Sequence, residues 1–141
     1  FQFETYNLVV EVTYTESSRQ DSAERYSVRE HLVKRIDKKK DVYALFIAPS
    51  LDLNTLQAYN SSYFYKGKEY HNLKIVPLTI EQYNNIFFKI MIQKDFKKNL
   101  FLKELFDKIL QNKNNEPTKW QKHINNVIED FLNLQNKEQI K

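Results

Sequence analysis

The sequence predicts an α/β sandwich with a mixed sheet, because short apolar runs alternate with amphipathic segments along much of the chain. The runs expected as strands are residues 3–15, 42–48 and 73–76. The segments expected as helices are residues 21–37, 52–60, 79–93, 97–112 and 117–136, of which the last two form a helical tail.

The first expected strand carries one carboxylate in an apolar stretch. Residues 3–15 are rich in β-branched and aromatic side chains, and Glu11 stands between Val10 and Val12. An unpaired carboxylate is costly to bury, so Glu11 needs a partner.

The helix expected over residues 21–37 supplies candidates for that partner. Asp21 or Ser22 is expected as its N-cap. Val28 and Leu32 recur at helical spacing and mark the face that packs on the sheet.

Two later runs indicate buried strands. Residues 42–48 lie between charged residues and Pro49, and a strand that follows a helix is typically parallel to the strand before it. Residues 73–76 form the third run. Residues 61–72 are predicted as a polar, Tyr-rich loop. An aromatic cluster with Lys66 and Lys68 interleaved either contacts DNA or packs at the domain edge, and packing is the favoured interpretation. The cluster comprises Tyr59, Tyr63, Phe64, Tyr65 and Tyr70.

Local chemistry marks the start of two later helices. Thr79 and Gln82 have the spacing of a capping box, and Pro117 suits the first turn of the last helix.

Composition limits the class of protein. The chain has 141 residues and a formal net charge of +4. It contains no Cys, and this excludes disulfides, thiolate zinc sites and cysteine nucleophiles. The charge is compatible with polyanion binding, although an AT-rich genome would also enrich Lys and Asn. We find neither a membrane-spanning run nor a signal peptide, and we expect a bacterial, cytoplasmic protein. The chain opens inside an expected strand without Met, so we expect a piece of a longer protein.

Three polar side chains could meet on one side of the first strand. Glu24 and His31 lie seven residues apart and therefore return to nearly the same helix face. If that face packs on the first strand, both approach Glu11, and two carboxylates with an imidazole suit a divalent cation. The structural alternative is that Arg29 or Arg35 pairs with Glu11 and that the His only makes a hydrogen bond.

A series of short motifs follows this arrangement in order. It comprises Glu11, Val12, Thr13, Gln20, Glu24, Ser27, Val28, His31, Leu32, residues 43–47 and residues 75–82. In order and spacing these residues resemble the AlwI-type restriction endonuclease family, which includes nicking endonucleases and small subunits of heterodimeric restriction enzymes. The resemblance covers roughly residues 1–93 and weakens in the last third.

The resemblance implies a PD-(D/E)XK nuclease with a restriction-endonuclease-like, three-layer α/β sandwich. Residues 1–93 would form an N-terminally truncated nuclease core, and residues 94–141 a helical extension packed on it. Glu11 would bind catalytic Mg²⁺, and Glu24 and His31 would complete the site. The implied reaction is hydrolysis of a DNA phosphodiester bond by a metal-activated water.

Two departures from the superfamily pattern matter. Thr13 stands where a Lys is usual, two residues after the strand carboxylate, so water would have to be oriented by Gln20 or His31. The first aspartate of the motif is expected before Phe1, so the chain alone should bind Mg²⁺ weakly and cleave DNA poorly.

The expected partners are double-stranded DNA and either a second copy or a second nuclease or recognition subunit, with no membrane. An alternative is a catalytically inactive, nuclease-like module that binds DNA or another subunit. A nuclease of repair or recombination built on the same core is a third possibility.

Overall fold

The computed structural model describes residues 1–36, 39–66, 68–92, 98–113 and 116–133. Along the chain the elements are β1 (Tyr6–Val12), α1 (Ser18–Lys34), β2 (Asp41–Ala48), α2 (Leu53–Asn60), β3 (Tyr63–Lys66), β4 (Glu69–Asn72), β5 (Lys74–Thr79), α3 (Ile80–Ile92), α4 (Lys98–Leu110) and α5 (Pro117–Asn133). None of the described helices is long and apolar enough to cross a membrane.

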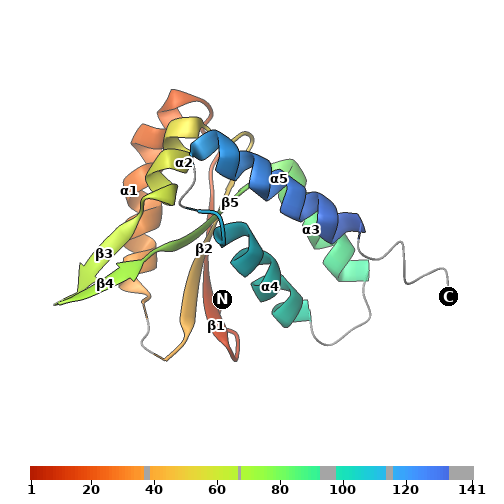
Figure 1. The fold of residues 1–141 in the computed structure, drawn as a ribbon, viewed down its shortest axis with the longest axis horizontal. Helices are drawn as coiled ribbons and strands as arrows, with labels where there is room; N and C mark the ends of the chain where they lie inside the picture. The colour runs from red at the N-terminus through yellow and green to blue at the C-terminus, as the bar shows by residue number, and fades with distance from the viewer. Residues whose placement is uncertain (37–38, 67, 93–97, 114–115, 134–141) are drawn as a thin grey trace.

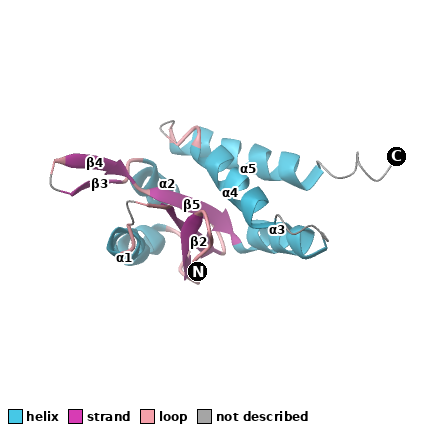
Figure 2. Cartoon of the chain, turned by 90° about the horizontal axis from the view of Figure 1, so that it is seen from below, coloured by secondary structure: helices cyan, strands magenta, loops and turns pink. Residues whose placement is uncertain are grey.

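The main sheet has the strand order β1-β2-β5, and both pairs of neighbours are parallel. Successive β-α-β connections that step in one direction along a sheet place their helices on the same face. Accordingly, α1 and α2 lie on one side of the sheet, whereas α4 and α5 lie on the other (Figures 1 and 2). The predicted α/β class is therefore confirmed.

Among the named strands, antiparallel pairing occurs only in a separate two-stranded sheet of β3 and β4. Outside them, Gln2 forms one isolated antiparallel bridge with Asn7 of β1. The single mixed sheet expected from the sequence is thus corrected, among the described residues, to a parallel sheet and a hairpin. The physical reason is that both connections within the main sheet cross over through a helix, and such a crossover returns the next strand in the same direction. The Tyr-rich loop predicted over residues 61–72 is likewise replaced by this hairpin.

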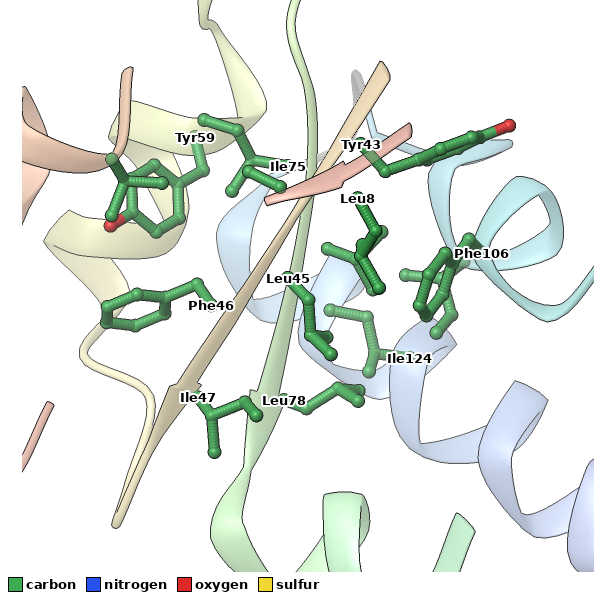
Figure 3. Packing of buried hydrophobic residues seen from close by; sticks show 14 of the residues in the cluster. Leu8, Tyr43, Leu45, Phe46, Ile47, Tyr59, Ile75, Leu78, Phe106 and Ile124 are labelled. Atoms are coloured by element: carbon green, nitrogen blue, oxygen red, sulfur yellow. The ribbon is translucent and has the colours of Figure 1, made fainter. Parts of the chain in front are cut away.

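The core lies on both faces of β2, whose residues from Val42 to Ala48 are all buried. Phe46 packs edge-to-face against Tyr59 of α2, with ring centroids 5.2 Å apart. Leu45 lies on the other side of β2, toward Phe106 of α4 and Ile124 of α5 (Figure 3). The last two helices therefore share one core with the sheet.

The helix ends agree with the local predictions only in part. At α3, the backbone N–H of Thr79 donates to Gln82 Oε1 at 2.9 Å, and that of Gln82 donates to Thr79 Oγ1 at 3.1 Å, which confirms the capping box. At α1, the predicted N-cap at Asp21 or Ser22 is wrong. The helix starts earlier, because Ser17 turns the chain with a φ of 58°.

Candidate active site

The candidate site lies at the carboxyl end of β1, on the side of the sheet that α1 covers. Glu11 pairs in register with Phe46, whose ring points toward α2, so the Glu11 side chain belongs to the same face. The backbone N–H of Thr13 donates to Ile47 O at 2.9 Å and continues the pairing beyond the strand. Ligand sites of open parallel sheets typically lie outside this end of the strands.

Glu11 and His31 are in direct contact. Nδ1 of His31 meets Oε1 of Glu11, and the two side chains are 48% and 24% exposed, respectively. Arg29 instead directs its guanidinium to Tyr63 O at 3.4 Å. Among the described residues neither Arg29 nor Arg35 contacts Glu11, so the arginine alternative is wrong and the imidazole is the partner of this carboxylate.

Glu24 forms a second pair, with Thr13. The buried Thr13 hydroxyl donates to Glu24 Oε1 at 2.8 Å. Val28, fully buried, stands between Glu24 and His31 on α1. The seven-residue spacing amounts to about 10 Å along the helix axis, so the two side chains meet β1 at different points. In the part of the chain that the structure describes, no three His, Asp or Glu side chains converge on one point.

Gln20 is placed differently from the other candidates. It is fully buried, and its amide donates to Thr15 O at 3.0 Å and to Ser50 O at 2.9 Å. Its Oε1 accepts the N–H of Asp52 at 3.0 Å. Because both amide hydrogens are used, this side chain joins the β1–α1 turn to the start of α2 and has no hydrogen left to orient water.

Tyr59 of α2 was missed as a site residue. Its side chain is fully buried, and among the described residues its hydroxyl has no hydrogen-bond partner. Burial raises the pKa of this phenol well above its usual range, and the charges of Glu24, Glu11 and Asp21 raise it further. The sequence grouped Tyr59 with the aromatic segment that follows it. Only the handedness of the β2–α2–β5 crossover, which sets α2 beside α1, could have indicated its place.

The chemistry of these groups suits a hydrated Mg²⁺. Hard divalent cations prefer carboxylate oxygens and retain several waters, and Glu11 and Glu24 supply two carboxylates. The unpartnered phenol of Tyr59 is a further group that could hydrogen-bond to an ordered water. The donor types therefore fit the ion.

An open hollow adjoins the site at the turn between β1 and α1. The residues that line it are Tyr14, Thr15, Glu16, Ser17, Arg19, Ser22 and Ala23. Arg19 and Tyr14 are both exposed, so a cation and an aromatic ring border the approach to the end of β1.

Comparison with protein families identifies the class of protein to which this α/β fold belongs. The model of the AlwI restriction endonuclease family matches residues 1–86, more than half of the chain. The chain belongs to this family, and the resemblance seen in the sequence is confirmed. No protein with curated annotation matches significantly.

Comparison with solved structures confirms the restriction-endonuclease-like fold. The crystal structure of the small subunit of the heterodimeric restriction endonuclease R.BspD6I superimposes with a TM-score of 0.73 at 21% sequence identity. The match covers 92% of this chain and 65% of that subunit, so the chain spans less than two thirds of its neighbour's length.

Proposed function

We propose that the chain is the catalytic part of a Mg²⁺-dependent type II restriction endonuclease that hydrolyses phosphodiester bonds of double-stranded DNA. The observation that carries the proposal is the contact between Glu11 and His31 beside the Thr13–Glu24 pair, at the carboxyl end of β1. Family membership supports the class of reaction.

The side chains divide the work according to their surroundings. Glu11 would hold the ion, and Glu24 would add a second negative charge on the same side of the sheet. When bound, Mg²⁺ would lower the pKa of the attacking water and neutralise charge on the scissile phosphate. His31 is half exposed and uses only Nδ1 toward Glu11, so its Nε2 can hold or move a proton at the surface where DNA arrives.

A nuclease with one site cuts one strand, so a double-strand break needs a second site. The structural neighbour is a subunit of a heterodimeric restriction enzyme. We propose the same kind of arrangement for this chain, which would act with a second copy or with another nuclease or recognition subunit.

The test is nicking of supercoiled plasmid by the full-length protein with Mg²⁺. Glu11→Gln keeps the shape of the side chain but removes its charge, and we expect the nicking rate to fall by at least about 100-fold. The matched control is Glu30→Gln, because Glu30 lies on the same helix α1 as His31 and is 70% exposed. Equal nicking by Glu11→Gln and wild type would refute the assignment.

The second candidate is a catalytically inactive module that binds DNA or another subunit. Two observations favour it: the described residues lack a three-ligand cluster, and Thr13 stands in place of the usual Lys. The two functions separate in one experiment. An inactive module would bind duplex DNA and leave the plasmid intact with either Mg²⁺ or Mn²⁺, whereas the enzyme would nick it.

A further inference from the structure

The β3–β4 hairpin presents two unlike faces. Because side chains alternate along a strand, the register Tyr63↔Asn72 and Tyr65↔Tyr70 places these four residues on one side, which we call the tyrosine face. Its three rings are 49%, 63% and 54% exposed in the order Tyr63, Tyr65 and Tyr70. The opposite side carries Phe64, which packs against the core. The packing predicted for the aromatic cluster therefore holds for Tyr59 and Phe64 and fails for the three tyrosines of this face.

The rings of the tyrosine face support one another. Tyr63 and Tyr70 stack with centroids 5.1 Å apart, and Tyr65 meets Tyr70 edge-on at 5.5 Å. Mutual packing restricts the side-chain rotamers before any partner arrives. A partner therefore meets a rigid aromatic surface and loses little side-chain entropy on binding.

The base of the hairpin is fixed to the body of the protein. The backbone N–H of Leu73 donates to Ser62 O at 3.1 Å. The buried ammonium of Lys113 donates to the same two residues' carbonyl oxygens, at 2.6 Å to Leu73 O and 3.3 Å to Ser62 O. The hairpin projects beside α1, away from α4 and α5 (Figures 1 and 2). It is thus an anchored ribbon with one exposed face.

The charges around the ribbon favour an anionic partner. Arg29 at its base has no carboxylate within ion-pair distance among the described residues, and the exposed Lys68 lies in the turn between β3 and β4. The one carboxylate of the hairpin, Glu69, lies on the face opposite the tyrosines and 3.4 Å from His71.

We propose that the tyrosine face binds the sugar–phosphate backbone of duplex DNA, with the three phenol hydroxyls as donors and with Arg29 and Lys68 as the flanking cations. Tyrosine hydroxyls and basic side chains are common donors to phosphate oxygens, and a two-stranded ribbon is narrow enough to follow a DNA groove. The choice of DNA as partner rests on the proposed function. The surface would hold the duplex without contributing to the chemistry.

The test is the affinity of the full-length protein for a fluorescein-labelled DNA duplex, measured by anisotropy in EDTA so that no cleavage occurs. We expect Tyr65→Ala to weaken binding about threefold to tenfold, the equivalent of one lost phosphate hydrogen bond with its ring contact. Lys68→Gln should lower the slope of log affinity against log salt concentration by about one.

The matched controls lie on other surfaces. Phe88→Ala removes a ring that is 62% exposed on α3, and Lys122→Gln removes an exposed cation on α5. Both should bind DNA like the wild type. The proposal is overturned if the wild type does not bind the duplex, if Tyr65→Ala binds as tightly as the wild type, or if sedimentation shows that Tyr65→Ala loses a protein–protein association instead.

The two proposals fail separately. If nicking requires Glu11 but DNA binding does not depend on Tyr65, the proposed role of the tyrosine face is refuted and the proposed enzymatic function stands. If DNA binding depends on Tyr65 but the protein does not nick DNA, the tyrosine face stands as a DNA-binding surface and the proposed enzymatic function is refuted.

Discussion

The hydroxyl of Thr13 reaches across from the end of β1 and donates a 2.8 Å hydrogen bond to the carboxylate of Glu24 on α1. A hydroxyl orients the carboxylate but leaves its charge in place. The side of the sheet that α1 covers therefore carries two carboxylates, Glu11 and Glu24.

Replacing Thr13 with Val should destabilise the protein. The substitution removes the donor to Glu24 and keeps the volume of the side chain, and a hydrogen bond to a charged group contributes about 1.5–3 kcal/mol. Urea denaturation measures the difference. Thr13→Ser keeps the hydroxyl and should retain most of the stability; if Ser and Val are equally destabilising, packing of the methyl group and not the hydrogen bond is responsible.

Replacing Gln20 with Leu should lower the free energy of unfolding by about 3 kcal/mol, more than most single substitutions do. The change leaves the N–H of Asp52 and the carbonyls of Thr15 and Ser50 without this partner inside the protein. Thermal unfolding followed by circular dichroism reports the loss. Gln57→Leu on the exposed side of α2 is the control and should stay close to wild type. A small effect at Gln20 would mean that the turn rearranges to satisfy these groups.

Replacing Tyr59 with Phe should stabilise the protein by about 1 kcal/mol, because a buried hydroxyl without a partner carries its full desolvation cost. The melting temperature should rise. Tyr43→Phe is the matched control and should lower the melting temperature, because the Tyr43 hydroxyl donates to Asp107 Oδ1 at 2.5 Å. If Tyr59→Phe melts lower than wild type, the hydroxyl has a stabilising partner in solution.

Stability should rise between about pH 8 and 10.5 through Lys113. Burial lowers the pKa of this ammonium from 10.5 to about 8, and the charge of Arg29 contributes to the lowering. The unfolded chain then binds more protons than the folded one in this window, so the free energy of unfolding increases with pH. The rise should be on the order of 3 kcal/mol at most.

The control for this pH dependence is Lys113→Met, which should lack the rise. Tyr6, whose pKa is raised to about 12, lowers the free energy of unfolding as the pH rises above 10. This effect is present in both proteins, so the difference between their free energies of unfolding reports on Lys113 alone. Parallel curves for Lys113→Met and wild type between pH 8 and 10 would contradict the assignment.

The parts of the fold that the sequence predicted are those that local chemistry determines. Val28 and Leu32 repeat at helical spacing and are buried, and the reciprocal bonds of Thr79 and Gln82 form within four residues. The hairpin was missed because its strands are short and its orientation depends on Lys113, which lies 40 residues beyond Leu73 in the sequence. No local pattern records that contact.

In the candidate site, too, local sequence predicted some positions, whereas others depend on distant segments of the chain. Helical spacing alone places Glu24 and His31 on one face, and both indeed approach β1. The role of Gln20 was not predictable, because two of its partners, Ser50 and Asp52, come from a distant segment. Tyr59 was not predictable either, since its position depends on how α2 crosses the sheet beside α1.

The core that the sheet shares with α4 and α5 affects how the protein is made. Leu45 and Leu78 face side chains such as Phe106 and Ile124, which the ribosome adds only later (Figure 3). The family-matched segment, residues 1–86, therefore leaves the ribosome with one apolar face of its sheet uncovered. Until α5 has emerged, this apolar face of the nascent chain is open to aggregation.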